Sequence, residues 1–214
     1  MMLPSMSVSR ESILDNVSRE SLGKLEHYLM LLEKWQKAIN LVSPATLRDA
    51  WNRHFLDSAQ LSPLLPGGAH TLFDFGSGAG FPGMVLAILN PGLSVHLVES
   101  DQKKCSFLAT VSRETMTPVS IHNVRIESLV TDAVPDVISA RALADLGQLL
   151  MYSEPWARLN PALVLLLPKG ENYTSELKEI SAARFAQCEE FPSFTSENAR
   201  ILRISGLKPS VHKE

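Results

Sequence analysis

The residues best placed to do chemistry in this chain are four glycines that fall within the segment FDFGSGAGFPG, residues 73–83. Glycine loses more conformational freedom on folding than any other residue, so such a cluster predicts a loop that needs a bare backbone. The segment lies between an expected strand, 71–75, and an expected helix, 82–90. Doubly wound α/β folds bind nucleotides at this point, which makes the loop the first candidate for a binding site.

Two cofactor classes fit the glycines. Gly78-x-Gly80-x-x-Gly83 satisfies the dinucleotide pattern, in which a helix N-terminus holds a pyrophosphate. Alternatively, Asp74-x-Gly76-x-Gly78-x-Gly80 is similar to the loop of methyltransferases that use S-adenosylmethionine. The second frame is favoured because Gly76 directly follows the strand. In addition, Asp74 would repel a pyrophosphate and attract the ammonium and sulfonium of S-adenosylmethionine.

An acidic residue closes the next expected strand, 94–99. Glu99 follows the glycine loop by about 20 residues, where an acidic side chain accepts hydrogen bonds from the ribose hydroxyls of either cofactor. Glu99 therefore predicts an adenosine site without choosing the cofactor. The complete set that we expect to bind the cofactor includes residues near the ends of later strands: Asp74, Gly76, Ser77, Gly78, Ala79, Gly80, Phe81, Glu99, Ser100, Ile126, Glu127 and Arg141.

The elements that must hold these residues alternate along the chain. Apolar segments expected to be strands are 71–75, 94–99, 119–124, 136–140, 162–167, 189–193 and 199–204, and the expected helices between them are 82–90, 102–116, 143–159 and 173–186. This alternation predicts an α/β fold with a mostly parallel seven-stranded sheet and helices on both faces. Earlier residues show only helical apolar spacing, over 11–40 and 45–65. We therefore expect an N-terminal helical cap, 1–68, and a cofactor-binding domain, 69–214.

Composition restricts the class of protein. The chain has 214 residues, of which 45% are hydrophobic, and two cysteines that match no metal-ligand spacing. We find no secretory signal at the N-terminus and no apolar run of about 20 residues, so we expect a soluble, reduced, cytoplasmic protein without membrane contact. The net charge is −3, whereas general nucleic-acid binders are usually basic. Contact with RNA would therefore require basic residues gathered on one face.

The motifs resemble those of the small-subunit ribosomal RNA methyltransferase G family over about residues 22–206. The resemblance rests on GSGAGFPG at 76–83, VES at 98–100 and KKCSFL at 103–108, together with motifs around Asn40, Arg53-His54-x-x-Asp57, Arg125-x-Glu127, Arg141-Ala142, Lys169-Gly170 and Arg200. It implies a Rossmann-like class I methyltransferase fold and S-adenosylmethionine as cofactor. It also implies methyl transfer to N7 of one guanine in bacterial 16S rRNA, within the small ribosomal subunit or an assembly intermediate.

The sequence departs from the family at three positions. Gln36, Val42 and Ala140 stand where the family usually carries Asn, Thr and Ser. None of the three lies in the glycine loop, so the departures bear on substrate positioning more than on the reaction. We expect no obligate protein partner and, since no exposed heptad pattern is visible, a monomer.

The substrate side is expected to be an open basic rim. Arg141, at the end of the fourth strand, could pair with guanine O6 or with a phosphate, and Lys169 could hold a phosphate nearby. Each candidate also has a structural interpretation: a rim salt bridge for Arg141, a surface pair for Arg125 and Glu127, a solvated Lys169, and a helix hydrogen bond between His54 and Asp57. The predicted substrate-side residues are Arg141, Arg125, Lys169, His54, Arg53, Asn40 and Arg200.

The chemistry at guanine N7 asks little of the side chains. N7 carries an in-plane lone pair and no hydrogen, so no general base is needed and catalysis can rest on proximity and orientation. A small-molecule methyltransferase remains an alternative and predicts an enclosed apolar cap over the site. An NAD-binding oxidoreductase, which would bind NAD(H), and a non-catalytic ribosome-assembly factor with a degenerate site are further alternatives.

Overall fold

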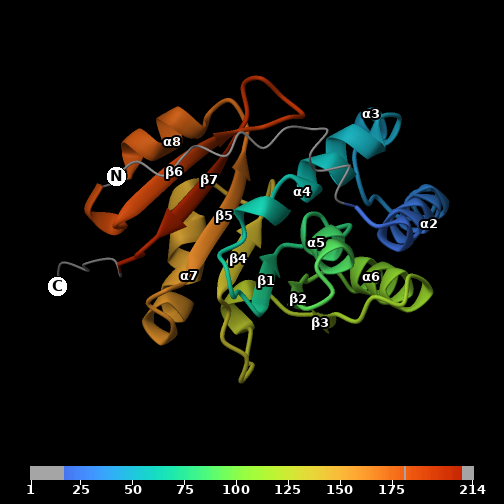
Figure 1. Cartoon of the computed structure of the whole chain (residues 1–214), viewed down its shortest axis with the longest axis horizontal. Helices are drawn as coiled ribbons and strands as arrows, with labels where there is room; N and C mark the ends of the chain where they lie inside the picture. Colours follow the sequence, from blue (N-terminus) through green and yellow to red (C-terminus); the bar gives the residue numbers. More distant parts are fainter. Residues whose placement is uncertain (1–16, 181, 209–214) are drawn as a thin grey trace.

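A single seven-stranded sheet forms the centre of the computed structural model, which describes residues 17–180 and 182–208 (Figure 1). The strand order is β3-β2-β1-β4-β5-β7-β6. The first five strands in this order are parallel, and β7 is antiparallel to both β5 and β6, which confirms the predicted mostly parallel sheet. The strands are β1 (Thr71–Phe75), β2 (Ser94–Val98), β3 (Ser120–His122), β4 (Val137–Ala140), β5 (Val164–Lys169), β6 (Gln187–Pro192) and β7 (Arg200–Ser205).

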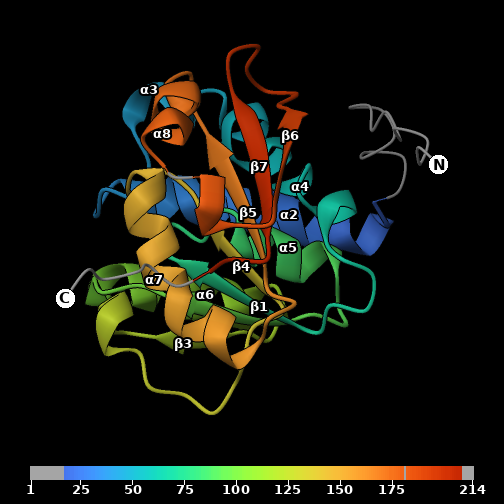
Figure 2. The same cartoon turned by 90° about the vertical axis from the view of Figure 1, so that its left-hand side faces the viewer.

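Helices cover both faces of this sheet (Figure 2). One face packs against α5 (Gly83–Leu89) and α6 (Gln102–Glu114), with α2 (Arg19–Gln36) packed against these two helices, and the other face packs against α7 (Leu146–Leu159) and α8 (Tyr173–Glu179). Neighbouring residues of a strand point to opposite faces. Leu72 of β1 accordingly joins the first core, whereas Phe73 and Phe75 join the second.

The site is positioned by the reversal of strand order between β1 and β4. From β1 the chain continues to β2 on one side, whereas from β4 it continues to β5 on the other. The loops after these two adjacent strands diverge and leave a crevice at their carboxyl ends. The glycine loop follows β1 and Arg141 follows β4, so the topology brings them to the same crevice.

The N-terminal helices differ from the prediction. The first ends at Gln36 rather than residue 40, and residues 11–16 of that prediction lie outside the described residues. The second, 45–65, is divided into α3 (Pro44–Leu47), a π-helix η1 (Trp51–Leu56), α4 (Asp57–Ala59) and a 3₁₀-helix η2 (Ser62–Leu64). The backbone N–H of Asp57 bonds to the carbonyl of Asn52, five residues earlier, which is the wider π spacing often seen at functional sites.

Two later helices are shorter than expected. Helix α7 begins at Leu146, because Asp145 caps it and Ala142 takes a left-handed φ of 51°. Helix α8 ends at Glu179, and a separate 3₁₀ turn, η4 (Ala182–Arg184), follows. A third 3₁₀ turn, η3 (Ile126–Ser128), follows β3.

The helical cap and the sheet share a core. Tyr28 and Leu32 of α2 are fully buried together with Met84 of α5 and Phe107 of α6. The division into a cap, 1–68, and a domain, 69–214, stays a prediction. In the described part of the chain, no helix combines the length and the apolar character needed to cross a membrane.

Candidate functional site

The glycines of the loop have distinct reasons to be glycine. Gly76, Gly78 and Gly80 take φ values of 63°, 56° and 91°, which L side chains rarely adopt. A Cβ at Gly76 would lie 2.5 Å from Leu143, and one at Gly80 would lie 2.5 Å from Tyr28. At Gly78 the nearest atom would be 3.7 Å away, so a side chain there would enter open space.

Asp74 supports the loop from below. Its side chain is fully buried, and it accepts hydrogen bonds from Ser139 Oγ at 2.7 Å and from the backbone N–H of Gly83 at 3.2 Å. Burial raises the pKa of Asp74 to about 6, although these hydrogen bonds lower it. The structure therefore places Asp74 beneath the loop and not in the cavity that the loop lines. The predicted part of Asp74 in binding the cofactor stays a prediction, and any such effect would act through the loop above it.

Glu99 is tied to the same loop. One carboxylate oxygen accepts the backbone N–H of Gly78 at 2.8 Å, and the other accepts that of Asp101 at 2.7 Å. The backbone N–H of Ser77 also donates to the carbonyl of Val98 at 3.1 Å. The ends of β1 and β2 are thus locked together by backbone groups, with a carboxylate at their junction.

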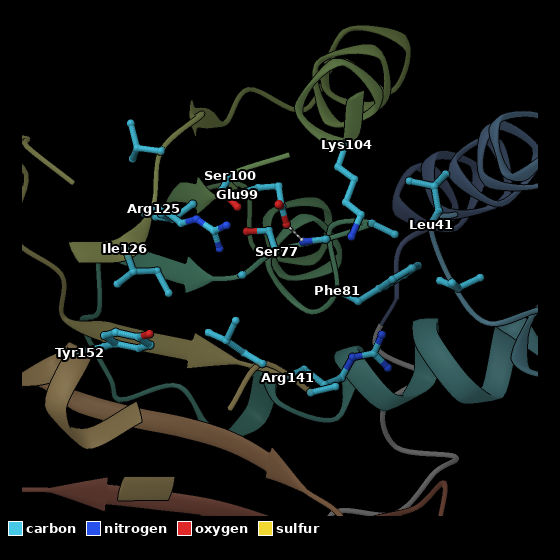
Figure 3. A pocket seen from close by; sticks show the side chains of 18 of the residues that line it. Leu41, Ser77, Phe81, Glu99, Ser100, Lys104, Arg125, Ile126, Arg141 and Tyr152 are labelled. Atoms are coloured by element: carbon cyan, nitrogen blue, oxygen red, sulfur yellow. Dashed lines mark hydrogen bonds between the residues drawn. The ribbon is translucent and has the colours of Figure 1, made fainter. Parts of the chain in front are cut away.

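A cavity of about 430 Å³, called the first cavity below, opens beside this junction (Figure 3). Every predicted cofactor residue lines it except Asp74, which lies beneath the loop, and Gly80. The lining residues that the sequence predicted are Gly76, Ser77, Gly78, Ala79, Phe81, Glu99, Ser100, Arg125, Ile126, Glu127, His54 and Arg141. Those that it missed are Leu41, Val42, Val98, Lys104, Val124, Ala142, Leu143 and Tyr152.

The two ends of the first cavity differ in character. Figure 3 shows Ile126 and Tyr152 at one end, Glu99 near the middle, and Phe81 and Arg141 at the other end. A carboxylate between a flat apolar end and a bare glycine backbone fits an adenosine-containing cofactor. Tyr152 was not predicted because it comes from the second turn of α7, where no local motif marks it.

Arg141 occupies the junction between β4 and η1. One guanidinium nitrogen donates to the carbonyl of Arg53 at 3.0 Å and to Asp57 Oδ2 at 3.2 Å. The other contacts His54 Nδ1 at 3.0 Å, and the guanidinium carbon lies 5.3 Å from the ring centroid of Phe81. The Arg141 side chain is only 19% exposed, so its place is fixed by these contacts.

The contact with Arg141 defines the tautomer of His54. A guanidinium has only N–H donors, so Nδ1 of His54 must accept, and Nε2 must carry the proton. Nε2 lies 2.9 Å from Thr46 Oγ1 and donates to it, and Thr46 Oγ1 donates in turn to the carbonyl of Ser43 at 3.0 Å. Burial and the charge of Arg141 lower the pKa of His54 to about 4. His54 is therefore neutral near pH 7.

The predicted hydrogen bond between His54 and Asp57 is not formed, because the ring nitrogens of His54 contact Thr46 and Arg141. Asp57 accepts from Arg141, from Gln60 Nε2 at 2.9 Å and from Thr195 Oγ1 at 2.6 Å. The segment is a π-helix at this point, so residues three apart no longer share a face as they do in an α-helix. The guanidinium of Arg141, which directly follows β4, bonds to both side chains instead.

A second cavity, of about 570 Å³, lies on the other side of Arg141. Within the described part of the chain, it shares three lining residues with the first cavity, namely His54, Arg141 and Ala142. Its other walls come from α3 to α4, from the segment after β5, and from the hairpin between β6 and β7. Arg53, Lys169 and Arg200, all predicted on the substrate side, line it.

The predicted open basic rim is only partly present. Lys169 is 9% exposed, pairs with Glu176 at 2.6 Å and donates to the carbonyl of Ala144 at 3.1 Å. It is therefore neutralised inside the wall and does not form an open cationic rim. Arg200 donates to the carbonyls of Glu197 and Ala199, both at 2.8 Å.

The remaining predicted residues lie elsewhere around the crevice. Arg125 lines the first cavity and not the second. Asn40 lines neither, and instead borders a separate hollow with Lys103 and Lys104.

The departure at Gln36 has a structural role. Its side-chain oxygen accepts the backbone N–H groups of Leu41 and Val42, both at 3.0 Å, and its Nε2 donates to the carbonyl of Val42 at 2.8 Å. Gln36 thereby fixes the two residues that form one wall of the first cavity.

Comparison with known proteins gives a family match over most of the chain. A family model described as rRNA small subunit methyltransferase G matches residues 21–202. The ribosomal RNA small subunit methyltransferase G of Rhodospirillum centenum is 48% identical over 194 residues, covering 90% of this chain and 88% of the relative. The protein of the same name from Rhodospirillum rubrum is 47% identical over 191 residues, covering 89% and 93%.

Solved structures agree on the fold. The ribosomal protein L11 methylase of Lactobacillus delbrueckii superposes with a TM-score of 0.58 at 16% identity, covering 73% of this chain and 79% of its own. The magnesium protoporphyrin IX methyltransferase of Synechocystis, solved with bound S-adenosylmethionine, gives a TM-score of 0.56 at 12% identity, covering 94% and 99%. At these identities the likeness concerns the fold alone.

Proposed function

The chain belongs to the rRNA small subunit methyltransferase G family, and from this premise we propose how its residues transfer a methyl group from S-adenosylmethionine to N7 of one guanine in 16S rRNA. The observation that carries the proposal is the first cavity. Its glycine loop, the carboxylate of Glu99 and the guanidinium of Arg141 border one space.

We assign the binding of S-adenosylmethionine to three parts of the first cavity. The carboxylate of Glu99 accepts hydrogen bonds from the ribose hydroxyls, as acidic residues at this strand end commonly do. Ile126 and Tyr152 enclose the adenine, and the bare backbone at Gly78 leaves room for the rest of the cofactor. When bound, the cofactor supplies an activated methyl group on a sulfonium.

The reaction needs no proton transfer. The N7 lone pair forms the new nitrogen–carbon bond, the sulfur–carbon bond breaks with its electron pair left on sulfur, and the guanine gains the positive charge. The chain therefore contributes position and exclusion of water, which can reduce a barrier by several kcal/mol. His54 is consistent with this chemistry, because both of its ring nitrogens are already engaged and it need not act as a base.

Arg141 is the residue that we assign to positioning the guanine. Its hydrogen bonds to Arg53, Asp57 and His54 use three of the five N–H groups of a guanidinium. The remaining donors can pair with guanine O6, which neighbours N7 on the same edge of the base. Asp57 forms an ion pair with Arg141 and so offsets its positive charge. The guanidinium can therefore donate hydrogen bonds to the guanine while repelling the positively charged methylated base less strongly.

A small-molecule acceptor is the alternative, and the character of the second cavity argues against it. That alternative requires an apolar enclosure, whereas this cavity is bordered by Arg53, Asp57, Lys169, Glu176 and Arg200. We further propose that the enzyme acts in the cytoplasm as a monomer on the small subunit or an assembly intermediate. Its net charge of −3 favours a structured target over naked RNA, which would demand broad electrostatic attraction.

The test is transfer of labelled methyl groups to small ribosomal subunits from a strain that lacks this gene, beside free 16S rRNA and free guanosine. Reductive cleavage at N7-methylguanine then locates the product. One new cleavage in 16S rRNA supports the proposal, and faster transfer to subunits than to free RNA supports the structured target. Binding of S-adenosylmethionine without transfer to any RNA would refute it and favour a small-molecule acceptor.

A further inference from the structure

The second cavity is separate from the first, yet it opens on the same reacting region. Among the described residues, only His54, Arg141 and Ala142 border both cavities, so these three mark the partition, meaning the boundary at which the two cavities meet. Ala142 takes a left-handed φ of 51°, which is uncommon for a residue other than glycine and marks a constrained backbone at the partition. A group held in the second cavity beside these three residues would therefore face the first cavity.

We infer that the second cavity receives the target guanine nucleotide, turned out of its RNA stack so that N7 faces the first cavity. This inference rests on the proposed function. Enzymes that modify a base inside a structured nucleic acid take that base into a pocket of its own, because the stack blocks access to the reacting atom. A cavity of about 570 Å³ beside the cofactor space offers such a pocket.

The polar groups of this cavity match the edge of guanine. Guanine offers N–H donors at N1 and N2 and an acceptor at O6. The Asp57 carboxylate accepts three hydrogen bonds, from Arg141, Gln60 and Thr195, whereas a carboxylate has about four acceptor sites. Asp57 thus keeps capacity for a guanine N–H, and Arg141 keeps donors for O6.

The walls are held in place before any base arrives. Gln60 accepts the backbone N–H of Phe194 at 2.8 Å and donates to Ser193 Oγ at 3.3 Å. Thr195 donates to Asp57 at 2.6 Å. These bonds fasten the hairpin between β6 and β7 to α4, although more than 130 positions separate the partners in sequence. A preformed pocket lowers the ordering cost of binding.

Two arginines border the pocket where the nucleotide backbone would enter. Arg53 is exposed, and Arg200 is half-buried with its guanidinium held by hairpin carbonyls. Cations at these places suit the phosphates on either side of a base that has left its stack. A chain with a net charge of −3 could then bind RNA with few positive groups, because the shape of the pocket and its contacts to the base supply the remaining affinity.

The test fills the second cavity and leaves the first unchanged. Gly170 lines the second cavity, has no left-handed φ, and a Cβ there would meet no atom within 4 Å, so Gly170→Leu adds bulk without backbone strain. Ser196→Leu adds bulk from the hairpin wall. Gly67→Leu is the matched control, because Gly67 also has open space around it and lines neither cavity.

For each variant, single-turnover methyl transfer to small subunits and equilibrium binding of S-adenosylhomocysteine are measured. We expect Gly170→Leu and Ser196→Leu to slow transfer by about 100-fold, the size of effect that a small misplacement of a reacting group produces. Their binding of S-adenosylhomocysteine should match that of Gly67→Leu and the unaltered chain.

Two results would overturn the inference. If both filled variants methylate subunits at the rate of the unaltered chain, the guanine does not enter this cavity. If both lose S-adenosylhomocysteine binding, the two cavities are not separate compartments. Failure of the unaltered chain to methylate RNA at all would instead remove the proposed function itself, so the two failures are distinguishable.

Discussion

The first and second cavities are built in opposite ways. The first is lined mainly by residues that follow the ends of β1, β2, β3 and β4 within a few positions, and Leu41, Val42, His54 and Tyr152 complete its wall. Its glycine loop is held by the carboxylate of Glu99 and by a backbone carbonyl. The second gathers segments from near residue 43 to residue 201, and its charged side chains are largely paired with one another. A cofactor common to many enzymes can be bound by a locally encoded crevice, whereas a particular RNA target requires a wall assembled from distant segments.

The largest expected effect comes from closing the first cavity. Gly78→Leu places a side chain in the open space beside Glu99 and forces a left-handed φ on a branched residue. We expect affinity for S-adenosylhomocysteine to fall by more than about 100-fold, with methyl transfer lost in parallel. Calorimetric titration measures the affinity, and Gly67→Leu serves as control. Retained affinity would show that the bare backbone at Gly78 does not border the cofactor.

The second-largest effect is expected at Arg141, which lines both cavities, and it distinguishes methyl transfer from cofactor binding. Arg141→Lys keeps a positive charge but cannot reach Arg53, Asp57 and His54 together. We expect methyl transfer to fall by about 100-fold while S-adenosylhomocysteine affinity stays within about threefold.

A matched control for this change is Arg203→Lys, which alters an arginine–carboxylate pair with Glu189 that lines neither cavity. Equal losses of cofactor affinity and transfer in Arg141→Lys would place Arg141 on the cofactor side only. That result would weaken the contrast between the cavities.

A smaller effect is expected at His54, and two variants separate its two hydrogen bonds. The amide oxygen of His54→Asn can accept from Arg141 as Nδ1 does, whereas the longer amide of His54→Gln reaches toward Thr46 as Nε2 does. Loss of one net hydrogen bond costs about 1 kcal/mol, so we expect kcat to fall by about fivefold in His54→Gln and less in His54→Asn. Similar kcat values in the two variants would show that orientation of Arg141 by His54 does not matter.

The smallest effect is a pair of opposite contributions to stability in acid. The pKa of His54 is lowered from 6.5 to about 4, so unfolding takes up a proton between these values and stability falls as the pH falls. The pKa of Asp74 is raised from 3.8 to about 6, so the folded state holds the extra proton and stability rises as the pH falls through that window.

Urea unfolding between pH 4 and 7 measures both contributions. Asp74→Asn should make the loss of stability in acid steeper than in the unaltered chain, and His54→Asn should make it shallower. Slopes that change in the same direction would show that one of the two groups does not titrate in this range.

Much of the first cavity could be predicted because its parts are close in sequence to strand ends. The rule that parallel strands end at one edge of a sheet is enough to bring together the glycine pattern, Glu99 and the pair Ile126-Glu127. For Asp74 the motif indicates the neighbourhood of the residue but not the direction of its side chain. In the strand, alternation turns Asp74 toward the face of α5, where Gly83 and Ser139 enclose it.

The sequence alone determined the α/β class, the glycine loop and the acidic strand end, since each depends on backbone conformation over a few residues. Only the tertiary structure decided that Lys169 is neutralised by Glu176, that η1 is a π-helix, and that Arg141 bonds to both His54 and Asp57. The physical reason is that side-chain pairing depends on which distant segments dock together. That docking is governed by burial and charge across the whole chain, and no local pattern records it.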